Sequence, residues 1–273
     1  MGGRSLVRDA LAGRSCERPP IIAAGITLAA RLAQIHVDDA LREPQAITTG
    51  VVDAVRTMHL DGVTLDIPKA CFLSSARDWH PEEIASIQVL GEVIRRLRAL
   101  LRESAAVLLA LPGPWYLSAE QWLSHDTTDL TGVVDDLLPL VRFLSPDCLD
   151  GFAVVEGSIS ADADLTAASD ALVPLWNFAR HFAVPSLFIA CDGPAGLVGI
   201  GADAIAVLAW TSHGERVDTE GSRIGRWLTA EATPEGGGRP VIPSPFVLIG
   251  SKECAEANLA ELRGMVAREA GAG

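Results

Sequence analysis

Eight short, continuous hydrophobic runs recur along the chain, and most are followed by a segment whose apolar positions have helical spacing. Each run has about the length of a strand that is buried on both faces. We predict strands at residues 21–26, 62–67, 105–111, 151–156, 185–191, 204–210, 226–231 and 245–250. Strands that alternate with helices indicate a parallel sheet, and eight such units indicate closure into a barrel.

The predicted helices lie between these runs. They cover residues 28–35, 45–59, 80–101, 131–143, 165–182 and 254–267. The units after the fifth, sixth and seventh strands are short, and residues 235–244 form a Gly/Pro-rich loop where a helix is expected. No repeat and no low-complexity linker divides the chain. The prediction is therefore an α/β fold, a single (β/α)8 TIM barrel over residues 1–273 that is somewhat shortened in its second half.

Composition supports such a core and disfavours one class of partner. Hydrophobic residues make up 49% of the 273 residues and aromatic residues only 5%, so the core must consist mainly of Ala, Val, Leu and Ile. The net charge of −13 disfavours binding to nucleic acid. Arg95, Arg96 and Arg98 do cluster, but we expect them to form ion pairs on a solvated helix face.

Cysteine usage and hydropathy indicate the compartment. The five cysteines are widely scattered, which argues against a disulfide framework. No stretch approaches the roughly 20 apolar residues of a transmembrane helix. Residues 1–18 lack the apolar core of a signal peptide. We therefore expect a reduced, cytoplasmic protein that acts on a small-molecule substrate and contacts neither a membrane nor nucleic acid.

Ionisable side chains gather after the predicted strands, where a barrel of this kind places its active site. They are Asp66 and Lys69, Glu156, Cys191 and Asp192, His213, Glu231, and finally Lys252, Glu253 and Cys254. Asp66 is the best single candidate, because a carboxylate at a partly desolvated barrel mouth needs a partner to hold it. The alternative for Asp66 is an ion pair with Lys69 or a helix-capping role.

Other residues near the predicted mouth have expected roles in substrate binding. Lys69 or Lys252 would orient a substrate carboxylate, while the alternative for Lys69 is an ordinary surface lysine. Trp115 and Trp210 would wall an aromatic substrate or else pack at the barrel rim. The remaining members of the predicted substrate-binding set are Tyr116, Glu156, Asp192 and Glu231.

A metal site is an alternative to a cofactor-free one. Cys191, His213 and Cys254 suit an open, catalytic zinc, with Glu231 or Glu253 as a fourth ligand. Zinc would lower the pKa of a substrate thiol and so create the nucleophile for methyl transfer. However, the spacing from 191 to 213 is no recognised close-range motif, and cysteine is commonly a small buried hydrophobe. We therefore expect no cofactor, with zinc as the alternative.

Several segments occur in an order that is typical of one superfamily. Residues 8–14 (RDALAGR) and 17–21 (ERPPI) precede the first strand, residues 61–66 (DGVTLD) form the second, and residues 111–117 (LPGPWYL) follow the third. With residues 253–266, these segments resemble the uroporphyrinogen decarboxylase superfamily, which also contains zinc-dependent corrinoid and thiol methyltransferases. The resemblance implies a (β/α)8 barrel and a homodimer. It also implies that Asp66 hydrogen-bonds pyrrole N–H groups and steadies positive charge on the substrate ring.

The chain departs from that family at functional positions. Residues 25–31 contain one arginine, Arg31, where the decarboxylase has an arginine-rich segment that grips carboxylates. Residues 248–252 lack the family histidine near the eighth strand. Ile189 stands where the methyltransferase branch has the histidine of its His-x-Cys motif, and Lys252 occupies the later ligand position, two residues before Cys254. The departures disfavour both uroporphyrinogen itself as substrate and the usual zinc site.

Three functions stay open. The first is a metal-independent decarboxylase or related lyase for a small electron-rich aromatic acid, in which Asp66 stabilises the protonated ring. The second is a zinc-dependent methyltransferase with an altered ligand set, whose methyl donor is a corrinoid protein or a methylated small molecule. The third is a barrel without catalysis that serves as a binding or assembly subunit.

Overall fold

The computed structural model describes most of the first two thirds of the chain and shorter segments of the remainder. The described residues are 2–67, 80, 84–119, 130–144, 149–158, 164–192, 206–209, 226–228, 247–249, 259–269 and 271. Within them, no helix is long and apolar enough to cross a membrane.

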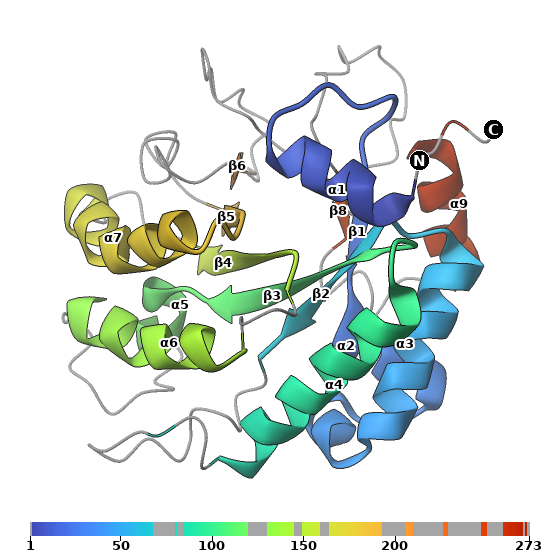
Figure 1. Cartoon of the computed structure of the whole chain (residues 1–273), viewed down its shortest axis with the longest axis horizontal. Helices are drawn as coiled ribbons and strands as arrows, with labels where there is room; N and C mark the ends of the chain where they lie inside the picture. Colours follow the sequence, from blue (N-terminus) through green and yellow to red (C-terminus); the bar gives the residue numbers. More distant parts are fainter. Residues whose placement is uncertain are drawn as a thin grey trace.

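One parallel sheet forms the centre of the molecule. Its strands are β1 (Ile21–Ala24), β2 (Gly62–Asp66), β3 (Ala106–Pro112), β4 (Gly151–Ser158), β5 (Ser186–Asp192), β6 (Ala206–Ala209), β7 (Arg226–Leu228) and β8 (Val247–Ile249). Their spatial order is β6-β5-β4-β3-β2-β1-β8-β7, and every recorded pairing is parallel. The sheet curls, and helices flank it (Figure 1). The predicted α/β fold with a parallel sheet is therefore confirmed.

Helices connect successive strands across the first four crossovers, from β1 to β5. The helices are α1 (Gly3–Leu11), α2 (Gly25–Ala33), the 3-10 helix η1 (Val37–Arg42), α3 (Pro44–Met58), α4 (Ala85–Leu101), α5 (Pro114–Ala119), α6 (Leu130–Leu144), α7 (Leu165–His181) and α9 (Leu259–Glu269). Along the outside of the sheet, α3 contacts both α2 and α4, and α6 contacts α7.

Two element boundaries differ from the prediction. Gly25 and Ile26 belong to α2 and not to the first strand, because the chain turns directly from β1 into the helix at Ala24. The helix predicted from His80 begins at Ala85, since Ile84 has an extended backbone. The carbonyl of Ile84 accepts hydrogen bonds from the backbone N–H groups of Ile87 and Gln88.

The two faces of the sheet carry separate hydrophobic clusters. We call the face whose buried residues include Ile22, Leu108, Ala153 and Leu187 the inner face. The outer face packs against the flanking helices through residues such as Val63, Leu65, Leu109, Val154 and Phe188. Successive residues of a strand point to opposite faces. The residues of the two clusters therefore show on which face each further side chain of the same strand lies.

Helix α1 covers the inner face where the strands begin. Its Val7 and Leu11 are fully buried in the inner-face cluster. The backbone N–H of Arg4 donates to the carbonyl of Glu103, which lies just before β3. No helix was predicted here from the sequence. The helical spacing of Leu6, Val7, Ala10 and Leu11, which are all buried, is nevertheless the signal for α1.

A buried carboxylate fixes α1 to the sheet. Asp150, whose side chain has no exposed surface, accepts hydrogen bonds from Arg4 at 2.8 Å, Arg8 at 3.1 Å and Arg98 at 2.9 Å. Arg96 pairs with Glu92 on the helix surface as predicted. The prediction of a solvated ion pair is wrong for Arg98, because it reaches inward to a carboxylate that the strand places in the protein interior.

Candidate functional site

The carboxyl ends of the strands bring several of the predicted residues to one edge of the sheet. Asp66 is the last residue of β2, Glu156 lies near the end of β4, and Cys191 and Asp192 end β5. Parallel strands present their carboxyl ends together, so these positions share an edge. The predicted residues outside the described part of the chain are Lys69, Trp210, His213, Glu231, Lys252, Glu253 and Cys254.

Asp66 belongs to the inner face of the sheet. Val63 and Leu65 on the same strand lie in the outer-face cluster, so Gly62, Thr64 and Asp66 alternate to the other side. In agreement, a Cβ atom at Gly62 would lie 3.4 Å from side-chain atoms of Ile22 and Val7, both of the inner-face cluster. Asp66 is partly buried, and its backbone is paired with Ala110 of β3.

A half-buried carboxylate on this face has a clear chemical capacity. Its negative charge is less screened than it would be in bulk water, so it can stabilise a positive charge that develops on a bound molecule. The inner-face residues nearest in register are small or apolar, namely Ala110 and Ala153.

Glu156 is oriented differently from Asp66. Phe152 and Val154 lie in the outer-face cluster, and Glu156 follows them with the same parity. Its carboxylate accepts hydrogen bonds from the backbone N–H groups of Tyr116 at 2.9 Å and Trp115 at 3.4 Å, both in the first turn of α5. Glu156 therefore caps a short helix on the outer side of the sheet.

Glu156 is completely buried, and this changes its ionisation. Removal of the carboxyl group from water raises its pKa to about 8, although the two backbone hydrogen bonds favour the charged form. No part of the side chain is exposed. In this structure Glu156 positions α5 and does not face solvent or a ligand, which differs from its predicted contact with substrate.

Gly113 makes this arrangement possible. A Cβ atom at this position would lie 2.1 Å from the carboxyl carbon of Glu156. The backbone N–H of Gly113 also donates to the carbonyl of Val155 at 2.7 Å. The turn after β3 is thus attached to β4 by backbone and side-chain contacts, and a larger residue at Gly113 would displace the Glu156 carboxyl group.

Trp115 and Tyr116 follow this turn, and each is partly buried. Trp115 packs against the outer-face cluster. That contact favours rim packing, the alternative in the sequence analysis, over a wall that faces a substrate on the inner face.

The metal site predicted from Cys191, His213 and Cys254 has one described member, Cys191. It lies in β5, one residue before its end, and two residues after the buried Ile189. Among the residues that the structure describes, no three His, Cys, Asp or Glu side chains are grouped so that they could hold a metal ion.

The amino-terminal edge of the sheet carries residues that the sequence analysis did not single out as a site. Asp61, just before β2, accepts two hydrogen bonds from Arg18 at 2.6 and 2.8 Å and one from the backbone N–H of Ile21 at 2.9 Å. This pairing raises the pKa of Arg18 through the hydrogen bonds to Asp61. Asp150 occupies the equivalent place before β4 and accepts from the N–H of Val107 at 3.0 Å.

The sequence matches no protein-family model and no curated protein. Among solved structures, the chain is similar to a GH18 chitinase from Pseudoalteromonas aurantia, with 13% sequence identity and a TM-score of 0.32. The alignment covers 85% of this chain and 71% of the chitinase chain. A TM-score this low supports no conclusion about fold or activity.

Proposed function

We propose that the chain forms a closed (β/α)8 barrel and acts as a decarboxylase of a small electron-rich aromatic acid, in line with its resemblance to the uroporphyrinogen decarboxylase superfamily. The observation that carries the proposal is the position of Asp66, half-buried on the inner face at the carboxyl edge of the sheet. The other conspicuous carboxylate at this edge, Glu156, is buried on the opposite face and is occupied by α5.

The chemistry needs one fixed negative charge. Protonation of the ring carbon that bears the carboxylate gives a cationic ring, which the Asp66 carboxylate stabilises. The bond to the carboxylate then breaks, its electron pair restores the aromatic ring, and CO2 leaves. Lys69 and Lys252 remain the predicted partners of the substrate carboxylate. The scattered cysteines support a cytoplasmic location.

The test is release of CO2 from a panel of pyrrole, indole and hydroxybenzoic carboxylic acids by the full chain. Asp66→Asn keeps the shape of the side chain and removes its charge, so kcat should fall by about 100-fold or more. Asp53→Asn, at an exposed position on α3, is the matched control and should leave kcat unchanged.

Two results would reject this function. One is wild-type rates from Asp66→Asn on a substrate that the wild-type protein decarboxylates. The other is about one zinc per chain in the purified protein, lost in Cys191→Ser, with no turnover of any acid in the panel. The second result would favour methyl transfer, and thiols would then be the substrates to screen.

A further inference from the structure

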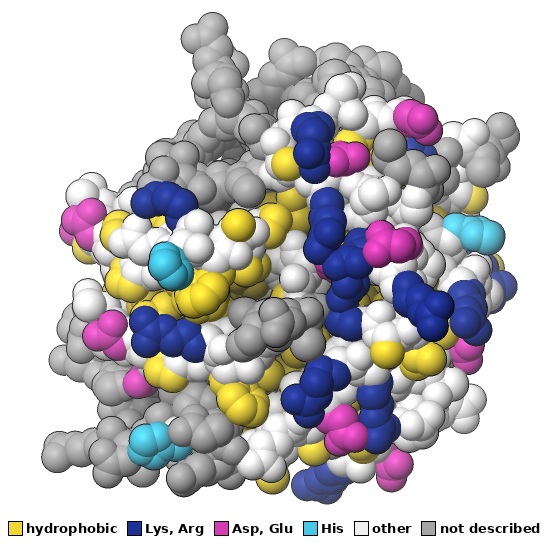
Figure 2. Space-filling view, viewed as in Figure 1, with side chains coloured by type: hydrophobic (Ala, Val, Ile, Leu, Met, Phe, Trp, Pro, Cys, Tyr) yellow, Lys and Arg dark blue, Asp and Glu magenta, His cyan; other side chains and the backbone are white. Residues whose placement is uncertain are grey.

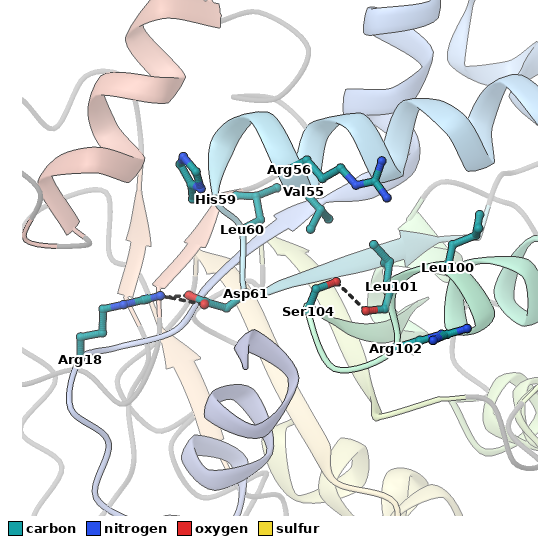
Figure 3. Close-up of a pocket in the computed structure, with 10 residues that line it drawn as sticks. All are labelled: Arg18, Val55, Arg56, His59, Leu60, Asp61, Leu100, Leu101, Arg102 and Ser104. Carbon is teal, nitrogen blue, oxygen red and sulfur yellow. Dashed lines mark hydrogen bonds and ion pairs between the residues drawn. The ribbon is translucent and has the colours of Figure 1, made fainter. Parts of the chain in front are cut away.

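A cavity of about 490 Å³ opens at the amino-terminal edge of the sheet, opposite to the edge that carries Asp66. It lies where α3 and α4 end, beside the segment that precedes β1 (Figure 3). The polar residues that line it are Arg18, Arg56, His59, Asp61, Arg102 and Ser104. The volume falls within the range of about 300–1,000 Å³ that is usual for small-molecule sites.

The charge of this cavity differs in sign from that of the whole protein. Asp61 is neutralised by the two hydrogen bonds from Arg18. Among the described residues, Arg56, His59 and Arg102 have no recorded ion pair with an acidic side chain. The guanidinium of Arg102 makes one long hydrogen bond, 3.4 Å from Nε to the carbonyl of Ala99, which leaves its other donors available. In a chain of net charge −13, the cavity is therefore locally basic.

Two of these residues occupy backbone positions that favour glycine. His59 has φ 55° and Arg102 has φ 48°, both in the left-handed region, at the ends of α3 and α4 respectively. Glycine is the usual residue at such helix ends, because a side chain there adds roughly 1 kcal/mol of strain. The chain instead places an imidazole and a guanidinium at these positions, and both line the cavity. Residues held in strained backbone conformations cluster at functional sites.

The face seen in Figure 2 agrees with a local concentration of positive charge. Arg side chains gather over α1 and over the neighbouring helices α3 and α4, whereas hydrophobic side chains gather over α6 and α7. Several arginines of this region are used internally, as in the contacts of Arg4, Arg8 and Arg98 with Asp150. Arg56 and Arg102 differ from them, because both line the cavity and are exposed, and neither pairs with Asp150.

We infer that this cavity binds a small phosphate-bearing molecule through Arg56, His59 and Arg102. Guanidinium groups present planar pairs of donors that match phosphate oxygens, and imidazole adds a donor from a third direction. This inference goes beyond the proposed decarboxylation and does not depend on it, because the cavity shares no residue with the edge at Asp66.

The probe for this site is inorganic pyrophosphate, titrated into the full chain by isothermal calorimetry at low salt. The wild-type protein should bind it with a dissociation constant of about 1 mM or tighter. Arg56→Gln and Arg102→Gln should each weaken binding by about tenfold, because each removes charge-assisted hydrogen bonds. Arg18 is unsuitable for substitution, since it holds the buried Asp61.

Arg95→Gln is the matched control, because Arg95 is exposed on α4 and does not line the cavity. It removes the same charge from the same helix and should leave the dissociation constant within about twofold of wild type. The inference is wrong if the wild-type protein does not bind pyrophosphate at about 10 mM. It is equally wrong if Arg95→Gln weakens binding as much as Arg102→Gln does, or if citrate competes as well as a second phosphate compound does.

Discussion

Glu156 is a carboxyl group removed from water and held between a strand and the first turn of a helix. Its oxygens accept from the N–H groups of Trp115 and Tyr116, and Gly113 leaves the space that the carboxylate fills. Burial opposes the ionised form more strongly than the two donors favour it, so the pKa rises to about 8. The stability of the contact between β4 and the turn after β3 therefore depends on pH through Glu156.

This coupling predicts a specific dependence of stability on pH. Between the ordinary value of 4.5 and about 8, the folded protein retains a proton on Glu156 that the unfolded chain has released. The contribution of Glu156 to the free energy of unfolding is thus fully present below about pH 4.5. It decreases as pH rises to about 8, by up to roughly 1.4 kcal/mol per pH unit. Urea denaturation measures the fall in the free energy of unfolding between pH 5 and pH 8. This fall should be smaller in Glu156→Gln than in the wild-type protein by at least about 2 kcal/mol. Equal losses in both proteins would contradict the raised pKa.

The strength of the sequence prediction differs between Asp66 and Glu156 for a physical reason. The carboxyl-edge rule correctly predicted that both lie at one end of the sheet. It could not assign their faces, because residues 151–156 are apolar on both sides of the strand before Glu156. Only the alternation fixed by Phe152 and Val154 in the packed structure shows that Glu156 points away from the inner face.

Among the secondary-structure elements, the beginnings of β2 and β4 are built alike. Each begins at an Asp-Gly pair, Asp61-Gly62 and Asp150-Gly151, whose glycine is the first residue of the strand. Each aspartate accepts from a backbone N–H of the preceding strand region and from at least one arginine. The recurrence of Asp-Gly before two apolar runs was a signal for these clusters. The partners could not be inferred, because Arg4 and Arg8 are more than 140 residues from Asp150.

The cluster at Asp150 should be a principal support of α1 and α4. Asp150→Asn would leave three arginines around a neutral, buried group, so the free energy of unfolding should fall by about 3–5 kcal/mol in urea denaturation. Arg8→Gln should cost about 1 kcal/mol or less, because the Arg8 side chain is 49% exposed. Asp53→Asn on the exposed side of α3 is the control. A loss below about 1 kcal/mol for Asp150→Asn would show that the cluster is not a support.

For the whole molecule, each of the eight predicted runs overlaps with a strand of one sheet. Long runs of Val, Leu, Ile and Ala favour strands that are covered on both faces, and this is why the strands were predictable from the sequence. Closure of the sheet into a barrel stays a prediction, because β6 and β7 are the two ends of the strand order among the described residues. Within the described part of the chain, β6 pairs with β5 and β7 pairs with β8.

Hydrogen exchange tests closure directly. In a closed barrel, β6 and β7 pair with each other, so all amides of residues 206–209 and 226–228 should exchange about as slowly as those of β3. In an open sheet, alternate amides of both strands point away from their only neighbour and should exchange rapidly. Fast exchange at alternate positions would overturn the proposed (β/α)8 barrel while leaving the parallel sheet intact.

The position of α1 has a kinetic consequence. Val7 and Leu11 are buried against the inner face, so α1 covers this face where the described strands begin. In the proposed barrel, a substrate that reacts beside Asp66 would therefore both enter and leave at the carboxyl edge of the sheet. Product would then have to leave before the next substrate molecule could bind, and accumulated product would compete with substrate for the same opening.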